Sequence, residues 1–427
     1  MMKKYEAYKD SGLEWLGMVP EHWEIDKLKY QFGLVTAPSE SSNKIGLENI
    51  ESATGRFIKT DSDFEGNGIA FLPNDIVYGK LRPYLQKVWL AEFSGSAVGD
   101  FYVFRCNEGT FPVYVKYLLL SHNFTVEADS STYGAKMPRV SYEFVANLKW
   151  AMPPLSEQRT IASYLDHKVG QIDALISEKE KMVEDLKAYR SSLITETVTK
   201  GLNKEVEMKD SGVEWIGKMP ATWTTVLLKR CATIMTGGTP STDIDRYWAN
   251  PTFRWYTPSD FSDDDVVLND SSRKLDETAI KEYAAKLFPK NSVLIVGIGA
   301  TLGKVGISLN ECSSNQQVNA IIFNSTLLPE YGAYYLLAGK EYIKSQSNAA
   351  TLPILNQSTM GELQIVVPTI EEQKDIVGFI NKKVSVIKES IENLQIQISY
   401  LKSYKSSLIT EAVTGKIDLR DWQTKKS

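Results

Sequence analysis

A glycine-rich stretch, VLIVGIGATLGKVG from Val293, resembles a strand followed by a phosphate-binding loop. Such a loop requires GxxxxGK followed by Ser or Thr, because its backbone amides and its lysine hold the phosphates. Here Ile298 takes the place of the first glycine, and Val305 follows Lys304. The glycines also miss the dinucleotide pattern GxGxxG by one residue. A tight turn or a close approach of the backbone to a ligand explains them better, so we predict no nucleotide site.

Other patterns of enzyme chemistry are also incomplete. An adenine methyltransferase needs an Asn/Asp-Pro-Pro-aromatic loop to hold the flipped base, but Pro153 and Pro154 stand between Met152 and Leu155. The acidic run at 263–265 could bind a metal, although such runs more often cap or solvate a loop. Because no nucleophile, base and metal ligands come together, we predict no catalytic residue, no metal and no cofactor on this chain.

The remaining polar clusters suit recognition of a DNA duplex. In the first half, GKLRPYLQK and KMPRV alternate cations with an aromatic, so that one edge could face the phosphates and bases. The candidate DNA-binding residues there are Lys80, Arg82, Tyr84, Lys87, Lys136 and Arg139. In the second half, TGGTPSTDIDRYW, WYTPSD and SSNQQVN offer hydroxyls, a cation and the amide side chains that read adenine edges. The candidates there are Thr239, Ser241, Arg246, Tyr256, Lys304, Asn315, Gln316 and Gln317. Any one of them could equally be an ordinary polar loop residue, so the clusters are stronger candidates than their members.

The overall charge argues mildly against DNA binding. The chain has a net charge of −5. Residues 30–147 hold 10 Lys and Arg against 13 Asp and Glu, and residues 230–362 hold 11 against 14. Neither region has the basic excess that usually accompanies phosphate binding. A basic face must therefore come from local clustering or from a partner.

Two long amphipathic stretches must position these clusters. From Ser156 onward, apolar residues recur every three and four positions, which predicts one helix of about 43 residues with a coiled-coil seam. A helix of roughly 65 Å is too long for one small domain and needs a partner helix. The stretch from Pro368 repeats this pattern 215 residues later. The predicted seam comprises Leu165, Val169, Ile172, Ile176, Val183, Leu186 and Leu193, with Ile380, Val384, Ile387, Ile391, Leu394, Ile398, Leu401 and Leu408. Lys179 stands where Leu394 stands in the second helix; it either fixes the register or extends to solvent.

A second repeat indicates a tandem duplication. YKDSGLEWLGMVPEHWEIDKLK from Tyr8 returns as MKDSGVEWIGKMPATWTTVLLK from Met208, with 11 identities in 22 positions. We call this the DSG motif. The predicted division is 1–150 (motif and first globular region), 151–203 (first long helix), 204–366 (motif and second globular region) and 367–427 (second long helix and C-terminal tail).

The connections predict how the halves are arranged. Few residues separate the first helix from the second DSG motif, so the second globular region should lie at the far end of that helix. The second helix must then run back, which predicts an antiparallel pair, approximate two-fold symmetry and a C-terminus near the N-terminus. DIVYGKLRPYLQKV aligns with SVLIVGIGATLGKV, and KMPRV aligns with TLPIL. Short β-branched and aromatic runs broken by Gly and Pro predict an α+β fold with two mixed α/β domains.

Composition sets the broad class of protein. A length of 427 residues with 43% hydrophobic residues predicts a folded protein of two to four domains. No apolar run approaches the roughly 18 residues of a membrane span, and no apolar segment follows the charged N-terminus. Three isolated cysteines favour a reducing compartment, so we expect a cytoplasmic protein without membrane partners.

Taken together, these patterns resemble the specificity subunit of a Type I restriction-modification system. The resemblance rests on both DSG motifs, the PPLSEQRTIASYLD and PTIEEQKDIVGFIN helix openings, the SSLITE closings and the TGGTPST and SDF segments. LENIES, GKLRPYLQKV and GDFYVFR extend it to the first globular region. It covers nearly the whole chain and implies two target-recognition domains separated by an antiparallel coiled coil.

The resemblance implies a function without catalysis by this chain. Each domain would read one half of a bipartite, asymmetric double-stranded DNA target, while the helices set the spacer between the halves. Two modification (methyltransferase) subunits would use S-adenosylmethionine, and restriction (endonuclease and translocase) subunits would use ATP, so neither cofactor is expected here.

Two alternatives remain open. The chain could be a structural clamp whose domains bind protein, against which the Arg and Lys clusters of both halves speak. It could also be an enzyme in its own right, which methyl transfer by the isolated chain would reveal.

Overall fold

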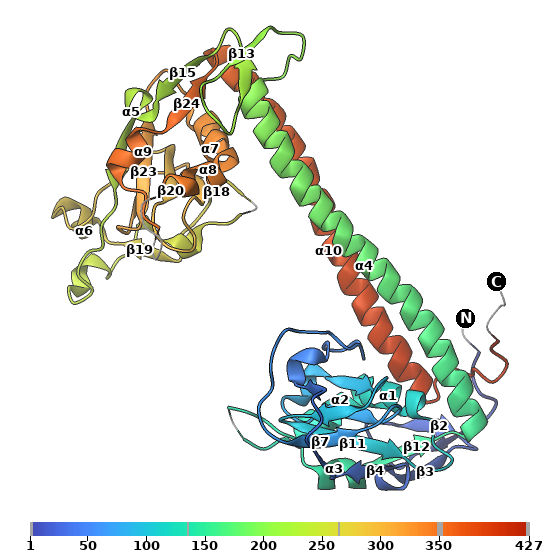
Figure 1. The fold of residues 1–427 in the computed structure, drawn as a ribbon. Coiled ribbons are helices and arrows are strands. Elements are labelled where there is room, and N and C mark those ends of the chain that lie inside the picture. Colours follow the sequence, from blue (N-terminus) through green and yellow to red (C-terminus); the bar gives the residue numbers. More distant parts are fainter. Residues whose placement is uncertain (1–2, 135, 264, 348–352, 424–427) are drawn as a thin grey trace. The chain divides into compact units, whose positions relative to one another are not determined.

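The computed structural model describes residues 3–134, 136–263, 265–347 and 353–423. These residues form two compact units. Unit 1 comprises residues 1–181 and 394–427, and unit 2 comprises residues 182–393. Two long helices, α4 (Leu155–Lys200) and α10 (Ile370–Val413), each contribute residues to both units. The two predicted long helices are thus confirmed (Figure 1).

Both long helices begin after a proline and end before a glycine. Pro154 precedes α4, and Pro368 lies two residues before α10. Gly201 and Gly415 follow the helices with φ of 73° and 72°, a left-handed conformation that ends a helix and that glycine adopts without strain. A Cβ on Gly415 would come within 2.3 Å of Pro20 in the first DSG motif. Glycine there therefore also lets the motif pack closely.

The residues of the predicted seam form the apolar face of each helix. Twelve of the fifteen are buried, namely Leu165, Val169, Ile172, Ile176, Val183, Leu193, Ile380, Ile387, Ile391, Leu394, Ile398 and Leu408. Leu186, Val384 and Leu401 are half-buried.

In unit 1 the two helices run antiparallel, as their connections predict. Asp173 Oδ1 accepts a hydrogen bond from Lys405 Nζ at 2.9 Å. Six residues further along α4, Lys179 Nζ donates to Gln397 Oε1 at 2.7 Å. Because the α10 partner moves backwards as α4 advances, the direction is antiparallel. The bond from Lys179 lies at the exposed surface, as expected of a lysine that extends to solvent.

The globular part of unit 1 holds the start of α4 and the end of α10. Trp23 of the DSG motif is fully buried and donates from Nε1 to Glu157 Oε1 at 3.1 Å. The next residue of α4, Gln158, accepts from the backbone amide of Phe111 at 2.8 Å. Tyr114 Oη donates to the carbonyl oxygen of Val413, the last residue of α10. One helix start and one helix end are therefore fixed in the same core.

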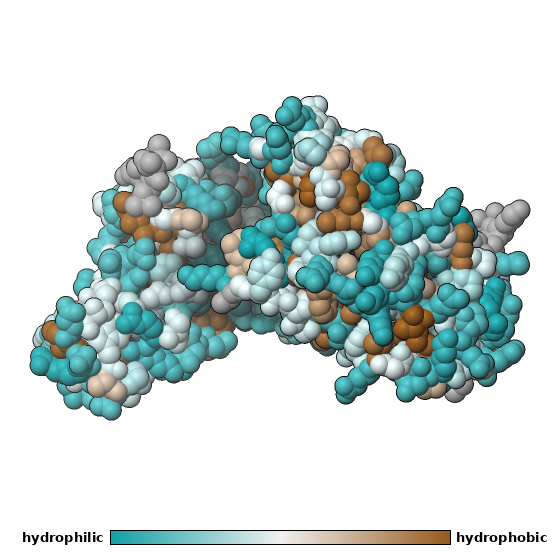
Figure 2. Space-filling view, turned by 90° about the horizontal axis from the view of Figure 1, so that it is seen from below, coloured by the Kyte–Doolittle hydropathy of each residue, from teal (hydrophilic) through white to brown (hydrophobic). Residues whose placement is uncertain are grey.

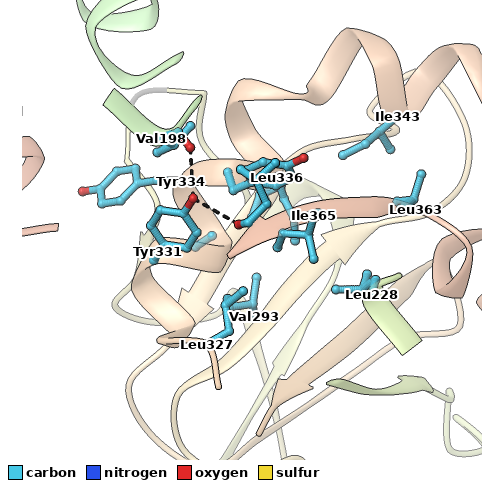
Figure 3. Packing of buried hydrophobic residues seen from close by; sticks show 14 of the residues in the cluster. Val198, Leu228, Val293, Leu327, Tyr331, Tyr334, Leu336, Ile343, Leu363 and Ile365 are labelled. Atoms are coloured by element: carbon cyan, nitrogen blue, oxygen red, sulfur yellow. Dashed lines mark hydrogen bonds between the residues drawn. The ribbon is translucent and has the colours of Figure 1, made fainter. Parts of the chain in front are cut away.

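Unit 2 repeats these contacts with the roles of the helices exchanged. Trp223 Nε1 donates to Glu372 Oε1 at 3.2 Å near the start of α10. Gln373 accepts from a backbone amide just before α7 (Pro329–Ala338) at 2.7 Å. Tyr331 Oη donates to the carbonyl oxygen of Val198, close to the end of α4, at 2.9 Å (Figure 3). Around Tyr331 lies a core that includes Val293, Leu327, Leu336, Ile343 and Ile365.

Small sheets make up the globular part of unit 1. Two four-stranded sheets have the orders β5-β7-β10-β6 and β4-β11-β8-β9, and two-stranded sheets pair β1 with β2 and β12 with β3. All pairs are antiparallel except β10 with β6. The strands are β1 (Tyr8–Asp10), β2 (Met18–Pro20), β3 (Glu24–Lys27), β4 (Phe32–Val35), β5 (Pro38–Ser39), β6 (Lys44–Ile45), β7 (Gly68–Phe71), β8 (Ile76–Gly79), β9 (Val88–Leu90), β10 (Gly95–Ala97), β11 (Phe101–Cys106) and β12 (Lys149–Met152). The helices are η1 (Leu28–Tyr30), η2 (Leu47–Asn49), η3 (Pro83–Leu85), α1 (Pro112–Leu120), α2 (His122–Ser130) and α3 (Tyr142–Asn147).

Unit 2 has a corresponding set. Its sheets have the orders β16-β23-β20-β21-β18, β19-β17-β22, β13-β14 and β15-β24. The strands are β13 (Met208–Asp210), β14 (Lys218–Pro220), β15 (Thr224–Leu227), β16 (Ala232–Thr236), β17 (Phe253–Tyr256), β18 (Val267–Leu268), β19 (Arg273–Leu275), β20 (Ser292–Val296), β21 (Val305–Ser308), β22 (Cys312–Ser314), β23 (Val318–Phe323) and β24 (Gln364–Val367). Besides α7, the helices are α5 (Leu228–Cys231), η4 (Asp245–Tyr247), η5 (Pro258–Asp260), α6 (Glu277–Lys281), α8 (Lys340–Ser345) and α9 (Gln357–Gly361). The predicted mixed α/β domains with a tandem-repeat skeleton are confirmed.

The two ends of the chain meet within unit 1, as predicted. The backbone amide of Asp418 donates to the carbonyl oxygen of Lys3 at 2.8 Å, and the Lys3 ammonium pairs with Asp421. The finer division at 150/151, 203/204 and 366/367 stays a prediction.

One face of the molecule is largely polar. The face seen in Figure 2 is mainly hydrophilic, with hydrophobic residues in small interspersed groups. Among the helices within the described ranges, none combines the length and the hydropathy that a membrane span requires.

Candidate nucleic-acid interface

Two neighbouring loops of unit 1 bring most of the first set of candidate residues together. One joins β8 to β9, and the other joins α2 to α3. The backbone amide of Arg82 donates to the carbonyl oxygen of Pro138 at 2.8 Å, and that of Val140 donates to Lys80 at 3.1 Å. An isolated bridge pairs Leu81 with Arg139. The loops are thus joined by their backbones, so side chains from both project from one site.

Unit 2 contains the same pair of joined loops. Gly299 N donates to Pro353 O at 3.2 Å, Leu355 N donates to Gly297 O at 2.8 Å, and an isolated bridge pairs Ile298 with Ile354. These bonds confirm the predicted alignment of GKLRP with VGIGA and of PRV with PIL. The first two residues of TLPIL, Thr351 and Leu352, lie outside the described residues. One backbone scaffold therefore carries different side chains in the two units.

Exposed cationic and aromatic side chains cover the unit 1 loops. Arg82, Tyr84 and Lys136 are all exposed, with Tyr84 at 52%. Sequence reasoning missed Tyr133 and Met137, which are 61% and 48% exposed on the second loop. Large apolar groups flanking a basic run were the signal that could have identified them. These five residues define what we call the basic-aromatic surface.

Arg82 has an unusual backbone conformation. Its φ is 52° and its ψ is 68°, in the left-handed region that residues with a side chain rarely adopt. In unit 2 the equivalent position is Gly299, which has a φ of 82°. The scaffold therefore demands a left-handed residue here, and unit 1 places an arginine where glycine would be least strained.

Two other candidates in unit 1 hold the loop in place. Arg139 donates two hydrogen bonds to Asp100, Nε to Oδ1 at 2.9 Å and Nη2 to Oδ2 at 2.8 Å. Lys80 Nζ lies 3.8 Å from Asp100 Oδ1. The hydrogen bonds from Arg139 hold the pKa of Asp100 below its usual value. Both cations thus anchor the loop, and a DNA contact by either stays a prediction.

Lys87 and Lys304 occupy equivalent positions, as predicted, but their ammonium groups point into the protein. Lys87 Nζ donates to the carbonyl oxygens of Leu47 and Ile50 at 2.9 and 2.6 Å, at the end of η2. Burial lowers the pKa of Lys87. Lys304 Nζ donates to the carbonyl oxygen of Phe261, which follows η5, at 3.2 Å. Because both ammonium groups donate to backbone carbonyls, we expect these two lysines to hold loops in place rather than to contact DNA.

Three further candidates in unit 2 have hydrogen-bond partners within the protein. Tyr256 is 0% exposed and donates to the carbonyl oxygen of Leu268 at 3.1 Å. This burial corrects the expectation that its ring is available to a ligand. Arg246 pairs with Glu282, Nη2 to Oε2 at 2.7 Å. Ser241 is exposed, and its hydroxyl accepts from the backbone amide of Asp243.

The amide candidates of unit 2 lie at a cleft of about 530 Å³ beside the joined loops. Gln316 and Gln317 line it, and both are exposed. Asn315 is 8% exposed and holds Gln317 by two hydrogen bonds. Thr239 donates to the side chain of Gln316. Sequence reasoning missed the other polar residues of the cleft, which are Thr236, Asn319, Asn356, Gln357 and Ser358.

The acidic run at 263–265 neutralises lysines. Asp263 accepts from Lys340 at 2.8 Å and lies 3.2 Å from Lys304, and the hydrogen bond from Lys340 lowers its pKa. Asp265 pairs with Lys388 at 2.9 Å. Asp264 lies outside the described residues. Within the described part of the chain, no three His, Cys, Asp or Glu side chains are arranged to hold a metal.

Sequence comparison shows similarity to one class of protein. Residues 220–400 match the family profile of the Type I restriction modification DNA specificity domain. The chain is 33% identical over 202 residues to the Type I restriction enzyme MjaIX specificity subunit of Methanocaldococcus jannaschii, covering 46% of this chain and 44% of that protein. It is 24% identical over 315 residues to the MjaVIII specificity subunit of the same organism, covering 68% and 67%. The chain thus spans about half the length of the first of these relatives.

The fold agrees with this class. A chain from a solved structure concerning complex assembly and conformational transition of the type I R-M system matches with a TM-score of 0.74. The identity is 17%, with 92% of this chain and 98% of that chain covered. The present chain is thus similar to Type I restriction-modification specificity subunits in sequence, and residues 220–400 match their DNA specificity domain.

Proposed function

We propose that this chain is the DNA-recognition component of a Type I restriction-modification complex and has no catalytic role of its own. Unit 1 reads one half of a bipartite, asymmetric target through the basic-aromatic surface. Unit 2 reads the other half through the cleft beside its joined loops. Methyl transfer and DNA cleavage are assigned to the modification and restriction subunits.

The observation that carries this proposal is the repeated pair of joined loops. The same backbone bonds occur at Arg82 and Pro138 and at Gly299 and Pro353. The exposed residues of unit 1, Arg82 and Tyr84, correspond to Gly299 and Thr301 in unit 2. A duplicated scaffold with two unlike surfaces is what an asymmetric target with two separate half-sites requires.

The charge distribution supports dependence on partners. Both globular regions are acidic overall, and several candidate cations already pair with carboxylates, as Arg139 does with Asp100 and Arg246 with Glu282. Few cations therefore remain to neutralise phosphates, whose contacts dominate affinity for DNA. We propose that the modification subunits supply most of this neutralisation and that the isolated chain binds DNA weakly.

Methylation sequencing tests the proposal directly. The chain is expressed together with its modification subunits in a host that lacks adenine methylation, and all modified sites are mapped. We expect one motif with two unlike half-sites and a gap of fixed length. A single contiguous motif, or modification of the same sites when this chain is omitted, would contradict the proposal.

Filter binding tests the dependence on partners. The isolated chain should bind a duplex carrying the mapped motif much more weakly than the complex does, and more weakly still as salt increases. Tight, salt-resistant binding by the isolated chain would exclude this part of the proposal.

A further inference from the structure

The cleft of unit 2 is lined by neutral groups throughout. Its described lining residues are hydroxyl, amide, aliphatic and glycine residues, and none of them carries a charge. The exposed amide residues that line it are Gln316, Gln317, Asn356 and Gln357, and the Asn356 side chain caps α9 by accepting from the backbone amide of Thr359. The cleft borders Gly297 and Ile298 of the joined loops, next to the position where unit 1 presents Arg82. At equivalent positions, unit 1 thus presents a cation and unit 2 presents neutral polar groups.

Two of these glutamines are held in position by other polar groups. Asn315 Nδ2 donates to Gln317 Oε1 at 3.0 Å, while Asn315 Oδ1 accepts from the Gln317 backbone amide at 3.0 Å. Gln357 Nε2 donates to Thr236 Oγ1 at 2.7 Å, and Thr236 Oγ1 donates to Asn319 Oδ1 at 2.6 Å. Asn315 and Asn319 are buried. Orientation by buried partners is the arrangement expected of a preorganised binding site.

The floor of the cleft requires close packing. A Cβ on Gly297 would lie 2.6 Å from Asn319 Nδ2 and 3.0 Å from the carbonyl oxygen of Leu355. Asn319 Nδ2 donates to that same carbonyl at 3.3 Å. The glycine therefore lets the buried amide reach the backbone of the second loop, which fixes the group that orients Gln357.

The unused hydrogen-bonding capacity of the glutamines matches one base. An amide NH₂ has two donors and its carbonyl oxygen has two lone pairs. After its bond to Thr236, Gln357 keeps one N–H and its Oε1; after its bond from Asn315, Gln317 keeps its NH₂ and one lone pair. One donor beside one acceptor complements the N7 and N6 amino group of adenine in the major groove. Guanine presents two acceptors there and is best matched by a cation, which the cleft lining lacks.

We propose that unit 2 recognises adenine in its half-site through Gln317 and Gln357. Asn315, Thr236 and Asn319 are positioning residues for these two amides. This inference rests on the proposed function, because it names the base class that one half of the recognition machinery reads.

The test uses the complete complex and paired substitutions. Gln317→Ala and Gln357→Ala remove both hydrogen bonds to the base, while Gln317→Glu and Gln357→Glu keep the shape and replace the donor with an acceptor. A carboxylate accepts from the cytosine amino group, so Gln317→Glu, which can still accept from Asn315, should gain cytosine at a position where the wild type requires adenine. Gln357→Glu also loses its bond to Thr236 and should only lose the preference for adenine. Gln346→Ala, an exposed glutamine just after α8 and outside the cleft, is the control. Each variant is expressed with the modification subunits, and its methylation motif is mapped.

We expect each Ala variant to lower the preference for adenine at one position of one half-site by about 5- to 150-fold. The other half-site, the gap and the control motif should not change. A variant that only destabilises the protein would reduce methylation at all sites without altering the motif. This result would count against the inference. A bipartite wild-type motif that none of the four variants alters would overturn the inference and leave the proposed function standing. A wild-type complex without a bipartite motif would overturn both.

Discussion

Arg82 has a left-handed backbone conformation, which glycine adopts with the least strain. For an L-residue with a Cβ the left-handed conformation costs roughly 1–2 kcal/mol, and Gly299 takes the equivalent place in unit 2. Strain of this kind persists where the side chain has a use. We infer that unit 1 tolerates the cost because the guanidinium contacts DNA.

The variant Arg82→Gly separates the side chain from the backbone. We expect the stability of unit 1 to change by less than about 1 kcal/mol, because relief of strain offsets the greater freedom of the unfolded chain. Methylation mapping should show relaxed selectivity at one half-site only. Asn74→Gly is the matched control, since Asn74 also has a positive φ, of 70°, and lies outside the basic-aromatic surface. Equal losses at both half-sites would refute separate reading by the two units.

Lys87 leads to the opposite prediction. Lys87→Met should leave the DNA motif unchanged and destabilise the segment around η2, because two backbone carbonyls lose their donor. The expected cost is about 1–3 kcal/mol, measured as faster hydrogen exchange of the amides at 44–60. Lys136→Met, an exposed lysine, should change exchange by less than about 0.5 kcal/mol. If Lys87→Met changed the DNA motif and left hydrogen exchange at the wild-type rate, Lys87 would be a DNA contact instead.

At this scale the sequence predicted residue types better than residue roles. It correctly aligned Lys87 with Lys304 and grouped the amides near 315–317. It could not distinguish Arg82, which is exposed, from Lys87, whose ammonium faces carbonyls of a segment about forty residues away. Tyr256 was misplaced because an aromatic beside polar residues can face either side of a strand.

The long helices are joined to the globular regions by ion pairs of opposite polarity. In unit 1, Asp173 of α4 accepts from Arg56 at 2.9 Å and from Lys405 of α10 at 2.9 Å. The repeat places Lys388 at the position equivalent to Asp173, and in unit 2 this lysine pairs with Asp265 of the globular region. An acidic helix residue thus meets a basic loop in one unit, and the charges are exchanged in the other.

The pair in unit 1 should be costly to break. The side chains of Asp173 and Lys405 are each 9% exposed. Asp173→Ala leaves the Lys405 ammonium buried without its carboxylate, which typically costs about 3–5 kcal/mol. Thermal and denaturant unfolding of the whole chain should both show the loss. The double variant Asp173→Leu with Lys405→Met should recover most of it, because an apolar pair replaces the buried charges.

Glu184→Ala provides the control for this pair. It removes an exposed pair with Lys187 on the same helix and should cost less than about 1 kcal/mol. If Asp173→Ala cost no more than this control, the buried pair would have no structural importance.

At the scale of elements, the repeats in the sequence carried most of the information. The heptad pattern predicted both long helices, and the expected start at Ser156 is within one residue of Leu155. The anchoring of each helix by Trp23 and Trp223 was not predicted, although the glutamates they bind are also equivalent in the repeat. Contacts between distant segments depend on three-dimensional packing, which periodicity does not encode.

Each unit contains residues of both long helices, and in unit 1 segments near both ends of the sequence share one core. Unit 1 combines the first 181 residues with the last 34, and its Tyr114 reaches the end of α10. Neither globular region has a complete set of helix contacts without the other half of the chain. Each unit therefore depends on helix residues from the other half of the duplication. The helices α4 and α10 are the elements that both units share.

Because the two units share α4 and α10, we predict that helix length sets the spacer of the proposed bipartite target. Four residues inserted between Lys181 and Met182, with four more between Asn393 and Leu394, fall at the boundaries of the compact units and leave the contacts within each unit intact. Each helix grows by about 6 Å and turns by about 40° beyond a full turn. A base pair advances DNA by about 3.4 Å and turns it by about 35°. The angle fits one additional base pair and the length fits nearly two, so we expect the gap to grow by one or two base pairs with both half-sites unchanged. Inserting the same residues in only one of the two helices is the control. It should impair the complex, because the apolar faces of α4 and α10 are then out of register. If methylation mapping of the double insertion variant returned the original gap, something other than helix length would set the gap.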